Sequence, residues 1–394
     1  MSERLENAIW PGWEITREIG RGGCGIVYEI QKDISGTIDR AVLKTITLPK
    51  ERSEIAELYS DGHDENSIRK RYEELREELV NEYKMMVELK GHRNIVYCDD
   101  LQYYPHEDGL GWNIYIKMEL LTPLTEYAKK PLQDKQVIKV GMDICRALIV
   151  CNQKNIIHRD IKPQNIFVAK DGNFKLGDFG VAKTVEKIST GTKTGTYKYM
   201  APEVYNNKPY GASCDIYSLG IVLYWLLNEH RLPFLPLPPQ VPTASEDTEA
   251  FLQRMNGREI PTPKNGSDKL RRIVQKACAY QPGKRYQSAT EMYEELEKAE
   301  KSMDLMNEET VGIFGGEEVD DVPEIKNEKK SRLVALLLAV FPPTGLFGIH
   351  DFYLQKKTAV LKLCTLNFAS MGWLYDVFAL CVGIYKDKDG ERLK

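Results

Sequence analysis

Two acid-bearing triplets, HRD and DFG, lie close together within residues 156–180, IIHRDIKPQNIFVAKDGNFKLGDFG. Asp160 can accept a proton from an attacking hydroxyl, and Lys162 can offset charge on a phosphate. Asn165 and Asp178 carry oxygen ligands of the kind that Mg²⁺ takes when it also shares phosphate oxygens. A single Asp or Asn is more often a turn residue. Their joint occurrence predicts a phosphoryl-transfer site, because that chemistry needs mainly positioning and charge neutralisation.

A glycine-rich stretch near the N-terminus predicts a turn that binds phosphate. GRGGCGIV, residues 20–27, follows one predicted strand and leads into another. Glycines let the backbone bend sharply and bring its N–H groups close to phosphate oxygens. An ordinary glycine turn has the same pattern, whereas a Rossmann fold is disfavoured because no helix follows. The candidate nucleotide contacts are Gly20, Gly22, Gly25 and Val27.

A lysine and a glutamate on neighbouring predicted elements could complete this site. Lys44 lies on the predicted strand 41–46, from which it can reach the α- and β-phosphates if an acid holds it. The predicted helix 64–90 offers Glu82, at the edge of its apolar stripe, with Glu78 as the alternative. Both are also consistent with ordinary surface acids. We expect Lys44 to pair with Glu82.

The composition excludes several classes of protein. The 394 residues are 42% hydrophobic and 28% charged, which indicates a globular rather than a disordered chain. A formal net charge of −4 argues against a nucleic-acid binder. The eight cysteines form no CxxC pair, a pattern typical of free thiols in a reducing compartment. The charged N-terminus lacks an apolar run, so we expect no signal peptide.

The chain divides into four parts by composition. Residues 10–300 are mixed and periodic, and residues 301–331, first acidic and then basic, predict a solvated linker. Residues 332–386 are strongly apolar, and residues 387–394 form a charged tail. Within the first part, helical patterns occupy residues 136–151, 214–228, 268–280 and 288–300.

Taken together, these motifs resemble a eukaryotic-type serine/threonine protein kinase over about residues 10–300. GRGGCGIV resembles its glycine-rich loop, AVLK its lysine strand, HRDIKPQN its catalytic loop and DFG its metal-binding triplet. GTYKYMAPE, residues 195–203, resembles the end of its activation segment. The resemblance implies an α+β, bilobal protein-kinase fold. A small sheet-rich lobe and a large helical lobe would hold ATP and Mg²⁺ between them.

The resemblance also implies roles for residues outside the first cluster. Thr196 would hydrogen-bond Asp160 and Lys162 in the active state, and Asp215 of DIYSLG would tie down the catalytic loop. The further assignments are Arg285 as the partner of Glu203, Met118 as gatekeeper, and Glu119 and Leu121 as hinge contacts to adenine.

Every catalytic position of the family is filled, which favours an active enzyme. The APE triplet and the PGKR stretch, which related small-molecule kinases usually lack, favour protein substrates. The alternative is a membrane-bound, pseudokinase-like ATP-binding scaffold that signals by conformation. Arg159 beside Asp160 is typical of kinases whose activation segment carries a phosphate. We hypothesise that self-association permits trans-autophosphorylation of Thr190 or Thr192, although an unmodified hydroxyl-rich loop has the same sequence.

Two apolar runs near the C-terminus predict a two-helix transmembrane hairpin. Leu333–Ile349 is near the lower length limit for a spanning helix, and Leu363–Ile384 is long enough to span. Asp376 in the second run should face a partner helix or water. Lysines and arginines flank both ends, which favours cytoplasmic termini. The alternative is a soluble kinase with a hydrophobic partner-binding tail.

This segment resembles a small family of two-transmembrane-helix domains. The matching positions are Gly345, Gly348, His350, Phe352, Tyr353, Leu354, Gly372, Trp373 and Asp376. Asp351 and Gln355 depart from the usual arginine and glycine of that signature. We therefore expect a two-pass protein of a bacterial cell membrane, with its kinase domain in the cytoplasm.

One linker threonine resembles a phosphothreonine motif. Thr310 in EETVGIFGG has acidic neighbours and Ile313 three residues on, as in motifs read by forkhead-associated domains. An unmodified linker hydroxyl is the simpler alternative.

Overall fold

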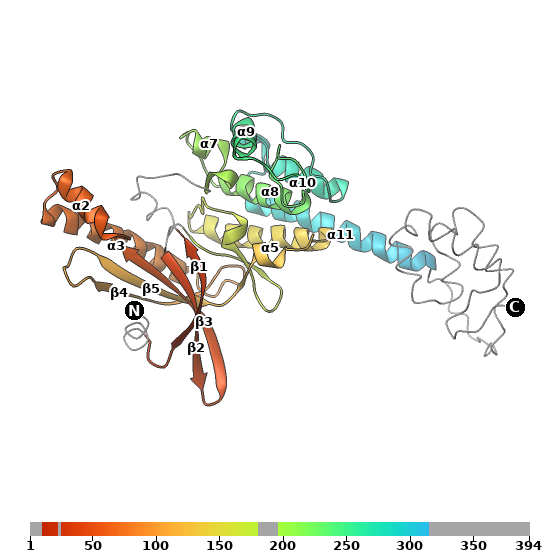
Figure 1. Ribbon diagram of the computed structural model, residues 1–394. Coiled ribbons are helices and arrows are strands. Elements are labelled where there is room, and N and C mark those ends of the chain that lie inside the picture. Colours follow the sequence, from red (N-terminus) through yellow and green to blue (C-terminus); the bar gives the residue numbers. More distant parts are fainter. Residues whose placement is uncertain (1–9, 23–24, 180–195, 315–394) are drawn as a thin grey trace, which may run out of the picture. The chain divides into compact units, whose positions relative to one another are not determined.

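The computed structural model describes residues 10–22, 25–179 and 196–314 (Figure 1). The chain divides into two compact units, Met1–Val311 and Gly312–Lys394. Apart from the end of one helix, the second unit lies outside the described residues. The fold and the site below therefore belong to the first unit.

The N-terminal part of this unit is a five-stranded antiparallel sheet with the order β1-β2-β3-β5-β4. Its strands are β1 (Glu14–Gly22), β2 (Gly25–Ile34), β3 (Thr37–Leu48), β4 (Cys98–Pro105) and β5 (Trp112–Glu119). The strands predicted around the glycine cluster and at 41–46 are confirmed. Lys44 lies opposite Val27 of β2 and Ile116 of β5, so this register places the lysine in the middle of the sheet.

Helices α2 (Arg52–Ser60) and α3 (Glu65–Glu88) accompany the sheet (Figure 1). The Asp64 side chain caps α3 by accepting a hydrogen bond from the Ser67 N–H at 2.8 Å. Ile68, Tyr72, Leu79 and Met86 are its buried residues, at the spacing that places apolar side chains on one face. The predicted helix 64–90 is therefore confirmed.

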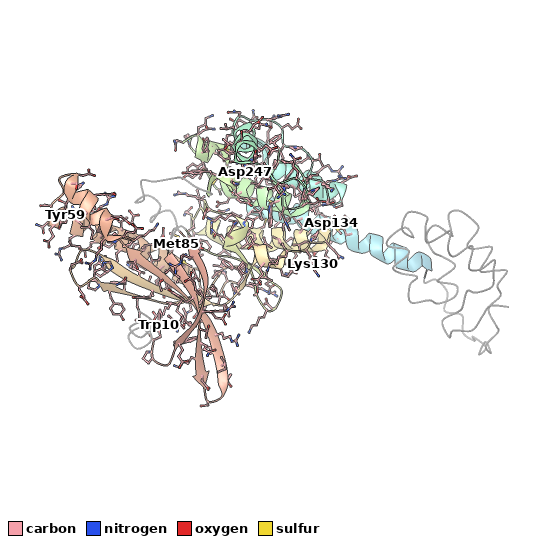
Figure 2. The ribbon with its side chains drawn as sticks, viewed as in Figure 1. Trp10, Tyr59, Met85, Lys130, Asp134 and Asp247 are labelled. Carbon is pink, nitrogen blue, oxygen red and sulfur yellow. The ribbon has the colours of Figure 1, made fainter. Side chains whose placement is uncertain are left out.

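The C-terminal part is mainly helical, as predicted (Figure 1). Helix α8 packs against both α5 and α10 and is buried along nearly its whole length, as expected of a helix that is apolar on all sides. Figure 2 labels Asp134, where α5 begins, and Asp247 on α9. The helices are α4 (Leu124–Tyr127), α5 (Asp134–Gln153), α7 (Pro202–Tyr205), α8 (Ser213–Leu227), α9 (Ala244–Met255), α10 (Asp268–Ala277) and α11 (Ala289–Phe314).

The remaining elements are a second, smaller sheet and three short 3₁₀ turns. Strands β6 (Thr122–Pro123), β7 (Ile166–Val168) and β8 (Phe174–Leu176) form a small antiparallel sheet. The 3₁₀ turns are η1 (Pro163–Asn165), η2 (Thr196–Tyr199) and η3 (Pro282–Lys284). The expected small sheet-rich lobe and large helical lobe are both present.

Helix α11 is longer than the sequence pattern predicted. It continues to Phe314, so residues 301–314 of the expected linker, Thr310 among them, are helical. The two apolar runs lie outside the described residues. Within the part of the chain that is described, no helix combines the length and apolar character needed to cross a bilayer.

Candidate active site

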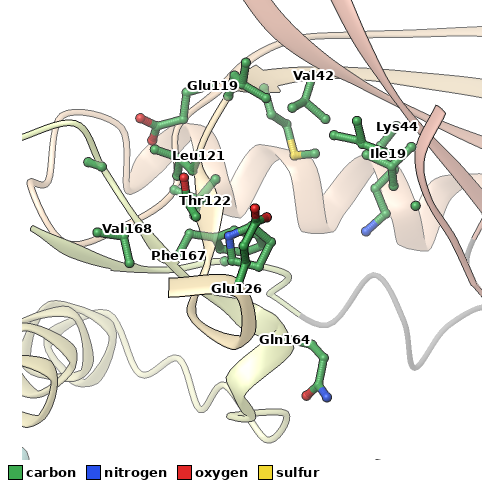
Figure 3. A pocket seen from close by; sticks show the side chains of 18 of the residues that line it. Ile19, Val42, Lys44, Glu119, Leu121, Thr122, Glu126, Gln164, Phe167 and Val168 are labelled. Carbon is green, nitrogen blue, oxygen red and sulfur yellow. The ribbon is translucent and has the colours of Figure 1, made fainter. Parts of the chain in front are cut away.

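A cavity of 870 Å³ lies between the sheet and the helical part (Figure 3). Figure 3 shows Lys44 on one side of the cavity, with Glu119 and Leu121 at the connection between the two parts. Of the residues expected to contact nucleotide, the lining includes Gly20, Val27, Lys44, Glu119, Leu121 and Asp178. The predicted gatekeeper Met118 also lines it. The sequence therefore identified much of the wall of this cavity.

The apolar remainder of the wall was not predicted. Ile19, Val42, Val96 and Phe167 also line the cavity. An apolar lining with a few polar groups is typical of a small-molecule site. An alternating strand pattern shows that such residues are buried, but it does not show whether they face the core or a cavity. Val42 lies two residues before Lys44 in the AVLK motif, and Ile19 directly precedes the glycine-rich stretch, so these two are the ones that the sequence could have indicated.

Lys44 is buried and pairs directly with Asp178. Its Nζ lies 2.6 Å from Asp178 Oδ1. Burial pushes the pKa of Asp178 up, but the Lys44 charge and hydrogen bond outweigh that effect, and the pKa lies below its usual value. The acid in this bond is therefore Asp178, whereas we expected Glu82 of α3. Pairing of Lys44 with Glu82 stays a prediction.

Asp160 is held by two neighbours in its own loop. Lys162 Nζ lies 2.8 Å from Asp160 Oδ2. The Asn165 amide donates from Nδ2 to both the backbone oxygen and Oδ2 of Asp160, each at 2.9 Å. The Asp160 side chain is buried, so these bonds restrict its orientation as well as compensating its charge. The structure thus brings together the three residues that the HRDxKxxN spacing predicted.

Asp215 fixes the backbone of the same loop. Its two carboxylate oxygens accept hydrogen bonds from the backbone N–H groups of His158 and Arg159, each at 2.8 Å. Arg159 adopts φ 66°, a left-handed conformation that a non-glycine residue holds only when its surroundings impose it. The contact between Asp215 and the catalytic loop, which the resemblance implied, is therefore confirmed.

His158 links this loop to the segment that carries Asp178. Its Nε2 lies 3.0 Å from the backbone oxygen of Gly177, and its ring contacts Phe179 with centroids 4.7 Å apart. Burial lowers the pKa of His158, against the opposing charge of Asp215. The Gly177 N–H also donates to the Asn165 backbone oxygen at 2.9 Å. These bonds place Asp178 beside Asn165.

The donor set fits a divalent cation that takes few protein ligands. Because Asn165 uses Nδ2 to bond Asp160, its amide oxygen is the atom that can face a cation, and the Asp178 carboxylate is the second candidate ligand. Among the described residues, no group of three or more His, Cys, Asp or Glu side chains could hold a metal ion. Two oxygen ligands plus phosphate and water match the preference of Mg²⁺.

Gly22 and Gly25 flank the turn between β1 and β2. Gly25 has φ 125°, and a Cβ there would lie 1.9 Å from the Thr45 backbone oxygen. Only glycine permits this approach of β2 to β3. At Gly22, by contrast, a Cβ would meet no other atom within 4 Å, so the role of Gly22 as a phosphate contact rests on the resemblance alone.

We expect Gly25→Ala to lower the free energy of unfolding by about 1–3 kcal/mol, because the substitution combines a strained backbone with a clash against β3. Gly22→Ala, its matched control, should change it by less than about 0.5 kcal/mol. Thermal unfolding of the two variants, with and without ATP, measures the difference. Equal stability of both variants would contradict this account.

Glu119 and Leu121 lie where the chain passes from β5 to the helical part. Glu119 Oε1 accepts a hydrogen bond from the Tyr97 N–H at 2.7 Å, and both carboxylate oxygens pair with Lys175 Nζ at 2.7 and 2.8 Å. Its side chain thus joins β5 to β8. Contact with adenine, through either residue, stays a prediction.

Glu203 and Arg285 form a buried ion pair below the site, as the resemblance implied. The two guanidinium Nη atoms each lie 2.7 Å from one carboxylate oxygen. The Arg285 side chain is 0% exposed and that of Glu203 is 5% exposed. Thr196 begins η2 seven residues earlier, but its side chain lies outside the described residues, and so do Thr190 and Thr192. Their predicted roles are therefore untested.

Comparisons with known proteins agree with this geometry. Residues 13–296 match the protein kinase domain family, and residues 328–378 match the TM2 domain family. The chain is 30% identical to serine/threonine-protein kinase PrkC of Bacillus subtilis, over 81% of this chain and 45% of that protein.

Two further relatives match a shorter stretch. Serine/threonine-protein kinase PknB of Mycobacterium leprae is 34% identical over 46% of this chain and 30% of its own length. Serine/threonine-protein kinase STY46 of Arabidopsis thaliana is 34% identical over 46% of this chain and 31% of its own length. The chain therefore spans less than half the length of each of these relatives.

Proposed function

Because the chain belongs to the protein kinase family, we propose that it transfers the γ-phosphate of ATP to serine or threonine hydroxyls of proteins. The observation that supports this most directly is the linked pair of charge clusters at the cavity. Asp160 is bonded by Lys162 and Asn165, and the Asn165 backbone oxygen accepts from the N–H of Gly177, the residue before Asp178, which holds Lys44. One cluster can activate a hydroxyl, while the other can bind phosphate.

Each side chain has a distinct task in this proposal. Asp160 orients the incoming hydroxyl and accepts its proton as the oxygen attacks the γ-phosphorus, while the bond from that phosphorus to the β,γ-bridging oxygen breaks and ADP leaves. Lys162, already 2.8 Å from Asp160, neutralises charge that develops on the transferred group. Lys44 holds the other phosphates. Mg²⁺, when bound through Asn165 and Asp178, supplies further neutralisation of phosphate charge.

We further propose that residues 332–386 anchor the protein in a lipid bilayer. The TM2 match covers most of that segment, and both apolar runs are long enough or nearly long enough to span. The kinase domain and both termini would then lie in the cytoplasm, where ATP is available, in a bacterial cell membrane. An anchor confines neighbouring copies to one surface, which promotes self-association and phosphorylation between copies.

Intact-mass analysis of the full chain in detergent, after incubation with Mg²⁺ and ATP, tests the transfer. We expect mass increments of one or more phosphates, located by peptide mapping at Thr190 or Thr192. The control sample contains EDTA in place of Mg²⁺ and should gain none. Increments found only outside residues 186–195 would contradict autophosphorylation of the activation segment while leaving kinase activity established.

The same experiment separates the proposal from the scaffold alternative. A scaffold would bind ATP, measured by fluorescence of a nucleotide analogue, yet gain no phosphate at any protein density in the membrane. Capture by a forkhead-associated domain through Thr310 remains a weaker proposal. Thr310 lies within α11, and such domains read extended peptides, so the helix would have to unwind there first.

A further inference from the structure

A second cavity, of 500 Å³, lies in the helical part away from the candidate active site. Its wall comes from α8, from the end of α9 with the loop after it, and from the segment between α10 and η3. Nothing in the proposed phosphoryl transfer uses this cavity. Its polar lining residues include Tyr217, Arg254, Arg258, Glu259, Gln275 and Lys284.

Arg254 is the unusual member of this wall. Its residue is 3% exposed, yet its Nε and Nη1 atoms have no hydrogen-bond partner among the described residues. Burial raises the pKa of the neighbouring Tyr217 phenol, although the Arg254 charge and a polar contact with Arg254 oppose that effect, so the phenol stays neutral and supplies no negative charge. A buried guanidinium with unsatisfied N–H groups is costly unless an anion compensates it.

The charges around Arg254 are also unbalanced. Arg258 and Lys284 line the same cavity and are exposed, whereas Glu259 is the one carboxylate in its lining. In the described part of the chain, no salt bridge within 4.0 Å involves any of these four residues. Three cations and one carboxylate therefore line the cavity, and within that part none of the cations has a direct ion pair. Arg258 donates from Nη1 to the Gln253 amide oxygen at 2.7 Å, which leaves its charge uncompensated.

Arg254 also bonds the backbone of η2. Its Nη2 donates to the backbone oxygen of Lys198 in η2 at 2.5 Å. The Lys198 ammonium pairs in turn with Asp247 of α9 at 2.8 Å. Helix α9 is thus tied to η2 at two points, and one of them is the side chain that lines the cavity.

We propose that this cavity binds a phosphate-type oxyanion, either inorganic phosphate or the phosphate group of a small metabolite. The two guanidinium nitrogens that bond no described residue can each donate a hydrogen bond to one oxygen of such an anion. The two N–H groups are buried, so the residues that line the cavity must shift slightly before an anion can reach them. The exposed side chains of Arg258 and Lys284 can move with this shift. Because Arg254 also holds Lys198, the bound anion fixes the position of η2.

The site is tested by titrating the full chain in detergent with inorganic phosphate and measuring the heat of binding by calorimetry. All samples carry Lys44→Met, which removes phosphate binding at the first cavity, and ionic strength is held constant with chloride. We expect saturable binding that Arg258→Gln with Lys284→Gln weakens about tenfold, since each lost charged contact contributes about that factor or less. Glu259→Gln should tighten it.

The controls separate this site from general surface charge. Arg272→Gln removes an exposed cation of α10 that does not line the cavity, and it should leave phosphate affinity unchanged. A parallel titration with glycerol phosphate distinguishes inorganic phosphate from a phosphorylated metabolite as the ligand. A higher affinity for glycerol phosphate than for inorganic phosphate indicates a metabolite. An affinity unchanged in the double variant, or no saturable binding below about 10 mM, would overturn the proposal. Binding is measured without transfer, so failure here leaves the kinase proposal untouched.

Discussion

Replacing Asp160 by asparagine should lower the rate of phosphoryl transfer by about 10²–10⁴-fold while ATP affinity stays nearly unchanged. The substitution keeps the shape of the side chain and removes its ability to accept a proton. Asp160 contacts Lys162 and Asn165 rather than the lining of the cavity that would hold adenine. Single-turnover rates with a generic protein substrate, alongside nucleotide binding by fluorescence, measure the two effects separately.

The matched control is Asp171→Asn, the same chemical change in the exposed turn between β7 and β8. It should retain the rate of the unmodified chain, because the hydrogen bonds of Asp171 go to Asn173 of its own turn. A rate for Asp160→Asn within about threefold of the unmodified chain would show that Asp160 is not the proton acceptor. If the unmodified chain binds ATP but transfers no phosphate, the scaffold alternative gains support.

Helix α3 and the catalytic loop could be predicted from the sequence because local rules determine both. The apolar residues of α3 recur at helical spacing, and Asp64 supplies a cap at its start. The loop places Asp160, Lys162 and Asn165 within six residues, so their contacts follow from a short turn of chain.

The bond between Lys44 and Asp178 could not be predicted in this way. The two residues are 134 positions apart, and the spacing in the sequence pointed to Glu82, whose pairing with Lys44 stays a prediction. Which acid a lysine meets depends on how α3 and the segment 177–179 pack, which no periodic pattern encodes. The same holds for Arg254, whose bond to the Lys198 backbone joins residues 56 positions apart.

The acidic composition after residue 300 predicts a shorter α11 than the structure has, because helix propensity outweighs acidity there. The acids after residue 300 indicated a solvated linker, but Glu, Lys, Met and Leu are also strong helix formers. Lys301 pairs with Glu297 one turn earlier at 2.8 Å, which supports a helix through this point. A charged segment can be solvated and helical at the same time.

Replacing Arg285 by methionine should lower the free energy of unfolding by about 3–5 kcal/mol. Arg285 pairs with both oxygens of Glu203 and also donates to the backbone oxygens of Ala279, Ser213 and Tyr280. Without the guanidinium, Glu203 remains as a buried, uncompensated carboxylate, and three backbone oxygens lose a donor. Urea unfolding followed by tryptophan fluorescence gives the change.

Two further variants show whether the effect comes from burial of the pair. Lys298→Met breaks an exposed pair with Glu295, and it should change the free energy of unfolding by less than about 1 kcal/mol. Glu203→Gln combined with Arg285→Met removes the stranded charge, so the double variant should be more stable than Arg285→Met alone. A loss below about 1 kcal/mol for Arg285→Met would mean that water compensates Glu203.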